Sequence, residues 1–138
     1  TPDFVMRLGY SAGKVLVDIS NPSSADYKEL VIGHTTSAAE EIQKLAPQAR
    51  VVKAFNSVFA QLVEPAARGA KPIQAFVAGD DAEAKAAVQQ LAGKLGMTAV
   101  DAGPLRNSRF LEPVGMMNIQ FGFFLGVGPT TAPSWAHA

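Results

Sequence analysis

Two asparagines stand directly after short apolar segments and are the first candidates for chemistry in this sequence. Asn21 follows residues 14–20 (KVLVDIS), and Asn56 follows residues 50–55 (RVVKAF). Both segments are typical of strands buried in a parallel sheet. In open parallel sheets, ligands bind beyond the carboxyl ends of the strands, where an asparagine amide can hydrogen-bond a carboxamide or a ribose hydroxyl. The alternative is that each asparagine only caps a strand end or the following helix.

Four segments follow predicted strands in this way, and we expect them to share one edge of the sheet. They are residues 20–22, 55–57, 79–81 and 103–105. Each can bring backbone amides or a small polar side chain to a ligand at that edge.

Other residue types that carry chemistry are absent or lack partners. There is no cysteine, which excludes thiolate chemistry, and no G-x-G-x-x-G motif follows a predicted strand. His34 and His137 have no partner at ligand spacing, so we predict no metal site. Asp18 lies in an apolar strand and is either a paired core carboxylate or directed at the sheet end. Arg109 and Glu112 are three residues apart, which predicts a surface pair.

The elements that must position these residues alternate along the chain. The pattern predicts strands and helices in turn, at residues 14–20, 37–46, 50–55, 57–68, 73–78, 82–95, 97–102 and 104–125. Ser37 and Glu40 predict a capping box, Asp80 and Glu83 can cap the next long helix, and Gly96 predicts a left-handed helix end. The alternation indicates one α/β domain over residues 1–138 with a mostly parallel sheet. The direction of its last strand is left open.

Composition limits the partners of this chain. Of 138 residues, 48% are hydrophobic and 17% charged, and 12 basic residues balance 12 acidic ones. This composition predicts a globular protein without attraction to nucleic acid or a membrane surface, and the lack of cysteine fits the reducing cytoplasm. Residues 116–125 are densely apolar but too short to span a membrane. We therefore expect a homo-oligomer, formed through the last helix or an unpaired sheet edge.

The segments together resemble a known family. Five runs carry the resemblance, in this order: residues 13–22 (GKVLVDISNP), 51–56 (VVKAFN), 77–81 (VAGDD), 100–105 (VDAGPL) and 107–112 (NSRFLE). They resemble the NADP-dependent oxidoreductases of the deazaflavin-coenzyme (coenzyme F-420) reductase type. The cytosolic domain of the six-transmembrane ferric reductases is similar. The resemblance covers residues 13 to about 125.

The resemblance implies a Rossmann-type domain that binds NADP(H) and passes hydride to a flavin or deazaflavin acceptor. The positions that match the family's nicotinamide side are Asn21, Pro22, Ala54, Phe55 and Asn56, and Leu105 would face the acceptor. The cofactor carries such chemistry while the protein holds donor and acceptor in line. We therefore expect no catalytic acid or base.

The missing glycine-rich loop leaves three hypotheses. The first is a fragment, the C-terminal part of a Rossmann-type oxidoreductase that is weak or inactive alone, with roughly 70 to 100 further residues encoded upstream. The second is a non-catalytic dimerisation module derived from the fold. The third is the soluble part of a membrane reductase. NADP rather than NAD rests on the resemblance alone, and the acceptor is left open.

Overall fold

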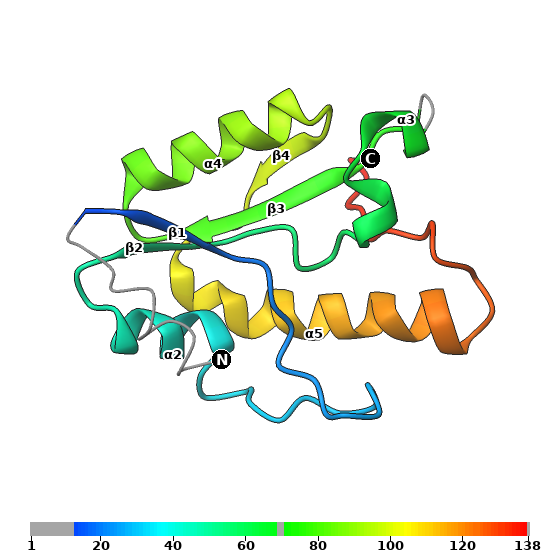
Figure 1. Ribbon diagram of the computed structural model, residues 1–138, viewed down its shortest axis with the longest axis horizontal. Coiled ribbons are helices and arrows are strands. Elements are labelled where there is room, and N and C mark those ends of the chain that lie inside the picture. Colours follow the sequence, from blue (N-terminus) through cyan, green and yellow to red (C-terminus); the bar gives the residue numbers. More distant parts are fainter. Residues whose placement is uncertain (1–12, 69–70, 138) are drawn as a thin grey trace.

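A four-stranded sheet forms the middle layer of the fold (Figure 1). The computed structural model describes residues 13–68 and 71–137. In the order β1-β2-β3-β4, the strands are Val15–Asp18, Arg50–Lys53, Gln74–Gly79 and Thr98–Asp101. The pairs β1–β2 and β3–β4 are parallel, and β2–β3 is antiparallel. The predicted α/β fold with a mostly parallel sheet is confirmed.

The change of direction occurs between β2 and β3, where Lys53 lies opposite Ala78. In its described part, up to residue 68 and from residue 71, the connecting segment holds the 3₁₀ turn η1 (Ala60–Leu62) and the four-residue helix α3 (Pro65–Arg68), whereas parallel neighbours are usually joined by a full crossover helix. The carboxyl ends of β1 and β2 therefore form one edge, called the β1–β2 edge. Those of β3 and β4 form the opposite β3–β4 edge. The prediction that all four candidate segments share one edge is wrong.

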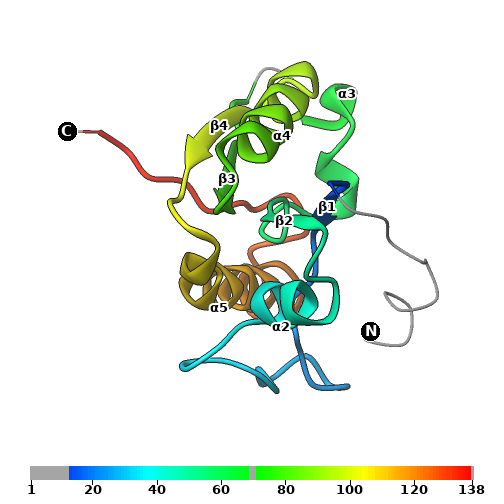
Figure 2. The same cartoon turned by 90° about the vertical axis from the view of Figure 1, so that its left-hand side faces the viewer.

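Helices cover both faces of the sheet (Figures 1 and 2). Helix α4 (Ala82–Lys94) lies on one face, and α2 (Ala38–Leu45) and α5 (Ser108–Ile119) lie on the other. Val52 and Val77 of the sheet pack against the buried stripe of α4 in a core cluster. This stripe is apolar at helical spacing, which explains why the segment forms a helix over the sheet.

The predicted helix ends agree with the structure in part. Ser37 accepts a hydrogen bond from the Glu40 amide at 3.1 Å, as in a capping box. The N-cap of α4 is Asp81, not Asp80 or Glu83, and Gly96 has the predicted left-handed conformation with φ of +76°. No helix in the described part of the chain is long and apolar enough to cross a membrane.

The last helix is shorter than predicted. A 3₁₀ turn, η2 (Leu105–Asn107), precedes α5, and the π-helical turn η3 (Gln120–Phe124) follows it. The chain then reverses, and Asn118 of α5 donates to the Thr131 carbonyl at 3.2 Å. Further along, the Trp135 ring packs edge-on against Phe76 of β3, with ring centres 5.5 Å apart. α5 itself begins beyond the end of β4, at the β3–β4 edge, and runs beneath the sheet toward the β1–β2 edge (Figure 1).

Candidate functional site

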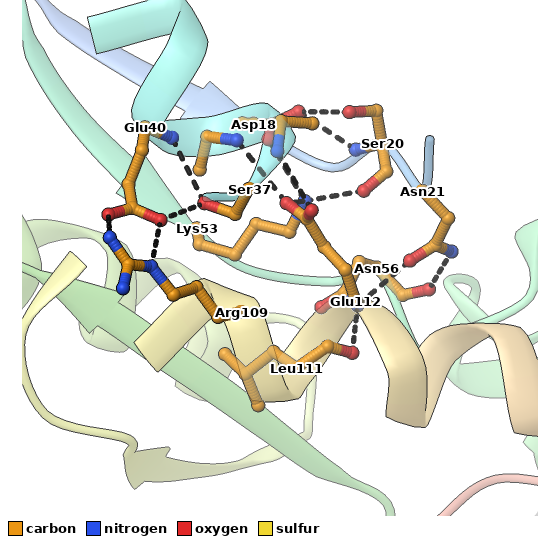
Figure 3. A network of polar contacts seen from close by, with 12 residues as sticks. Asp18, Ser20, Asn21, Ser37, Glu40, Lys53, Asn56, Arg109, Leu111 and Glu112 are labelled. Carbon is orange, nitrogen blue, oxygen red and sulfur yellow. Dashed lines mark hydrogen bonds and ion pairs between the residues drawn. The ribbon is translucent and has the colours of Figure 1, made fainter. Parts of the chain in front are cut away.

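The two predicted asparagines meet at the β1–β2 edge, bonded to each other and to α5 (Figure 3). Asn21 Nδ2 donates to the Asn56 carbonyl at 2.7 Å, and Asn56 Nδ2 donates to Asn21 Oδ1 at 3.0 Å. Asn56 Nδ2 also donates to the Leu111 carbonyl of α5 at 2.7 Å. Their side chains join two strand ends to a helix 55 residues further along the chain. These contacts are therefore not the capping of a strand end or of the following helix that was the alternative explanation for each asparagine.

Not all hydrogen-bonding groups of the two asparagine side chains are used within the described residues. Both Nδ2 protons of Asn56 are used, whereas Asn21 Nδ2 has one hydrogen bond and a second proton to give. Within residues 13–68 and 71–137, Asn56 Oδ1 accepts no hydrogen bond, and it is not among the unpartnered polar atoms that are sealed from solvent. Among the described residues, Asn21 thus retains one N–H and Asn56 one carbonyl oxygen without a partner.

A glycine in α5 makes this arrangement possible. A Cβ on Gly115 would lie 2.4 Å from Asn21 Oδ1 and 2.8 Å from Asn56 Nδ2. Contacts this short do not occur in real structures, so only glycine lets α5 approach the amides so closely. Gly115 was not predicted as a site residue. A glycine in the middle of an apolar helix was the available signal.

Phe55, between β2 and Asn56, has a strained backbone. Its φ is +63°, a region that bulky side chains rarely occupy and that costs about 1–3 kcal/mol. The Phe55 carbonyl accepts from the Val58 amide at 3.2 Å, and the ring packs in the core. Strained residues of this kind cluster at functional sites, and this one turns the chain so that the Asn56 amide meets Asn21.

A buried ion cluster lies beneath the asparagines. Lys53, the last residue of β2, is fully buried, and its ammonium donates to Asp18 Oδ2 at 2.9 Å and Glu112 Oε2 at 2.8 Å. It also donates to the Ser20 carbonyl. Of the two explanations for Asp18, the paired core carboxylate is confirmed. Lys53 was missed by sequence reasoning, although a lysine in an apolar strand requires a buried partner.

Glu112 extends this cluster to the helix layer. Its carboxylate accepts from the amides of Ala38 at 2.8 Å and Ala39 at 3.3 Å, at the N-terminus of α2, where a negative charge is stabilised. The predicted surface pair of Arg109 and Glu112 is wrong. Arg109 instead forms a two-pronged ion pair with Glu40 at 3.0 and 2.9 Å, and this hydrogen bonding raises the pKa of the guanidinium. α2 and α5 lie side by side on one face of the sheet, so Arg109 reaches Glu40 of α2, whereas Glu112 reaches the sheet and the first amides of α2.

A cavity opens beside Asn21. It has a volume of about 310 Å³ and is lined by Ser20, Asn21 and Pro22 on one side and by a mainly apolar set from α2 and the preceding loop, Ile32, Ala38, Glu41, Ile42 and Leu45. Its size lies at the lower end of small-molecule sites. The structure thus brings predicted site residues Asn21 and Pro22 to the wall of one cavity.

Two other predicted site residues lie in the core. Ala54 directly follows β2 and is fully buried in the core cluster between the sheet and α4. Its amide donates to the Asp18 carbonyl at 3.1 Å. Leu105 packs against Ala39 and Val51 in a separate cluster. Its amide bonds Asp80 at the β3–β4 edge, so the structure does not bring Leu105 together with the asparagines. The described residues contain no cluster of three side chains suited to a metal ion.

Comparison with known proteins identifies relatives that include two kinds of reductase. No family model matches the chain. It is 37% identical over 103 residues to metalloreductase STEAP3 of Rattus norvegicus, covering 75% of this chain and 20% of the relative. It is 31% identical over 109 residues to the F420-dependent NADP reductase of Methanocaldococcus jannaschii, covering 74% of this chain and 48% of the relative. The chain thus spans half of its relatives' length or less.

A solved structure has the same fold. The crystal structure of a putative F420-dependent NADP reductase from Arthrobacter sp. FB24 superposes with a TM-score of 0.75 at 34% identity, over 86% of this chain and 55% of that chain. The α/β sheet described above is therefore Rossmann-like, and the resemblance to NADP reductases supports an NADP-dependent oxidoreductase fold. Both resemblances predicted from the sequence are confirmed, and this chain is a homologue of the F420-dependent NADP reductases and of the STEAP metalloreductases.

Proposed function

We propose that this chain is the nicotinamide-side part of an NADP(H)-dependent oxidoreductase that transfers hydride between NADP(H) and a flavin-like or deazaflavin acceptor. The observation that carries the proposal is the asparagine pair at the β1–β2 edge, with one N–H and one carbonyl oxygen available. The names of the relatives support NADP as the cofactor. As part of the same proposal we place this chain in the cytoplasm, because the sequence contains no cysteine, as fits a reducing compartment.

The pair fits the carboxamide of a nicotinamide ring. A primary carboxamide presents one carbonyl acceptor and two N–H donors. Asn21 Nδ2 has a proton for the carbonyl, and Asn56 Oδ1 has lone pairs for the N–H group. The remaining donors and acceptors of both asparagines are held by the protein, so neither amide needs to reorganise to bind.

The chain's own residues contribute position, not acid–base chemistry. The bound cofactor supplies the hydride. The asparagines fix the rotation of the ring, and Pro22 and the apolar wall of the cavity exclude water from the ring's neighbourhood. Holding donor and acceptor carbons close and in line accounts for much of the barrier reduction in such reactions. Acceptor selectivity then depends on surfaces beyond this edge.

Direct binding measurements test the proposal. We expect saturable NADPH binding by the polypeptide extended to the length of its relatives, weaker binding by residues 1–138 alone, and weak NADH binding by both. Replacing both asparagines, Asn21→Ala with Asn56→Ala, should weaken NADPH binding of the extended polypeptide at least about tenfold, because two hydrogen bonds of about 1 kcal/mol each are lost. Asn107→Ala is the control, since the Asn107 side chain donates to the Ala102 carbonyl at the other edge.

The outcomes separate the alternatives. Absence of NADPH binding by the extended polypeptide would contradict the proposal. Equal losses in the double variant and in Asn107→Ala would show that the asparagines act only through general stability. Turnover with flavin, deazaflavin and ferric acceptors identifies the acceptor class once binding is established.

A second candidate function is association, favoured by the outer face of the last helix. Four large apolar side chains at helical spacing are 40–69% exposed there: Phe110, Met117, Phe121 and Phe124. Such a continuous apolar face marks an interaction surface in soluble proteins. It supports homo-oligomerisation through this face, either alongside cofactor binding or, in a non-catalytic module, in place of it.

A further inference from the structure

All three protons of the buried Lys53 ammonium have acceptors, and one of these acceptors is a backbone carbonyl next to the asparagine pair. The two carboxylates, Asp18 and Glu112, lie 2.9 and 2.8 Å away and compensate the charge. The third acceptor is the carbonyl of Ser20, the residue immediately before Asn21. A bond to that carbonyl is not needed for charge balance, but it fixes the start of the Asn21 loop.

Ser20 is held from its other side as well. Asp18 Oδ1 accepts from the Ser20 amide at 2.9 Å and from its hydroxyl at 2.7 Å, while Asp18 Oδ2 receives Lys53. Amide, hydroxyl and carbonyl of Ser20 are thus all bound within one cluster. The peptide that leads into Asn21 is therefore held at its carbonyl, and the residue before Asn21 is also held at its amide and hydroxyl.

The same ammonium also locates α5, which carries the contacts of Asn56. Glu112 joins Lys53 to the N-terminus of α2. The preceding residue, Leu111, accepts from Asn56 Nδ2 at 2.7 Å, and a Cβ at Gly115 would overlap both asparagine amides. Lys53 therefore holds Asn21 through Ser20 and Asn56 through α5 (Figure 3).

We propose that Lys53 is a positioning residue that fixes the relative placement of the Asn21 and Asn56 amides for the cofactor carboxamide. This inference rests on the proposed function. A buried ion network is often no more stabilising than apolar side chains of the same volume, so the network's charge and its positioning role can be separated by mutation. Methionine fills the volume of the lysine side chain but gives the Ser20 carbonyl no donor.

The decisive variant combines Lys53→Met, Asp18→Asn and Glu112→Gln. It removes all three charges together and keeps oxygen acceptors for the amides of Ser20 and Ala38. We expect a melting temperature close to that of the native chain, but NADPH binding weakened more than about tenfold, as for loss of two well-placed hydrogen bonds. The matched control is Lys85→Met with Asp101→Asn, an ion pair at the β3–β4 edge with its atoms 3.0 Å apart, which should leave NADPH affinity unchanged.

A second measurement needs no cofactor. Side-chain amide protons of Asn56 are both hydrogen-bonded, so NMR should show slow exchange with solvent in the native chain and faster exchange in the triple variant. Native NADPH affinity and native exchange in a folded triple variant would overturn the proposal. If the extended polypeptide with the native sequence binds no NADPH, the proposed function fails, and the exchange rates alone decide whether Lys53 orders the pair.

If the triple variant does not fold, the single variant Asp18→Asn tests the positioning role of Lys53. This single change removes one carboxylate charge but leaves the Lys53 ammonium on the Ser20 carbonyl and on Glu112. Positioning by Lys53 then predicts a lower melting temperature with slow Asn56 amide exchange retained below the melting transition. Exchange that accelerates in proportion to the loss of stability contradicts it.

Discussion

The two edges of the sheet differ in how their polar groups are held. At the β1–β2 edge, Lys53, Asp18 and Glu112 are at most 5% exposed and are bonded across three separate elements. At the β3–β4 edge, the main ion pair joins Lys85 to Asp101, whose side chain is 57% exposed. Both edges follow apolar strands and look alike in sequence. The ion cluster at the first edge is more deeply buried, because α5 and the start of α2 close over it.

Single charge removal should reveal the largest difference between the edges. Lys53→Met alone leaves two carboxylates buried together, and breaking such a network costs about 3–5 kcal/mol of unfolding free energy. Lys85→Met at the other edge should cost less than about 1 kcal/mol, as for exposed ion pairs. Urea denaturation of both variants measures the two values. Similar losses would show that the edges are held alike.

Two helix glycines provide the next comparison. Gly115→Ala should weaken NADPH binding at least about tenfold and lower stability by about 1–3 kcal/mol, because the new Cβ overlaps Asn21 Oδ1. Gly93→Ala in α4 meets no atom within 4 Å and should stabilise the chain by about 0.5–1 kcal/mol. Calorimetry and NADPH titration on both variants test this. A stabilised Gly115→Ala variant with native affinity would show that α5 can move away at no cost.

The two edges also show which parts of the fold and of the site could be predicted from the sequence. Apolar runs located all four strands, and Asn21 and Asn56 were found because each follows such a run. The reversal between β2 and β3 was not found, since the direction of a strand depends on how its connection packs and not on its own residues. That reversal separates Leu105 from the asparagines.

Contacts between residues far apart in the sequence were the other feature that could not be predicted. Glu112 bonds the Ala38 amide, 74 residues away in the chain, and its neighbour three residues before it, Arg109, was the only partner that sequence spacing suggested. Lys53 was within reach of sequence reasoning, because a lysine between buried strand residues must find a carboxylate. It finds two, Asp18 of the neighbouring strand and Glu112 of α5, a helix that can pack close to the strand ends because residue 115 is glycine.

The next comparison asks whether the apolar outer face of α5 and η3 joins two copies of the chain. We expect Met117→Glu with Phe121→Glu to weaken self-association at least about tenfold, because each carboxylate would be buried without a partner in the interface. The inner contacts of α5 are untouched, so the melting temperature measured at low concentration should stay close to native. Analytical ultracentrifugation over a concentration series measures the association. A native chain that is monomeric throughout contradicts the oligomer hypothesis.

The smallest expected effect belongs to an exposed carboxylate at the β3–β4 edge. The hydrogen bond from the Ala84 amide, followed by the charge of Arg50, lowers the pKa of Asp81 below its ordinary 3.8. The folded state thus binds a proton less readily than the unfolded state. Asp81 therefore contributes stability that is fully present above the unfolded pKa and is lost as the pH falls through the lower, folded pKa.

Asp81→Asn should remove this pH dependence while retaining the cap, because asparagine is an equally good N-cap residue. Thermal melts from about pH 6 to about pH 2 should show the native chain losing its advantage over Asp81→Asn only in the acid range. The effect is small because Arg50 and Asp81 are partly solvated, with side chains 30% and 42% exposed. An advantage that persists unchanged at the acid end would mean that hydrogen-bond geometry, and not the charge of Asp81, stabilises the start of α4.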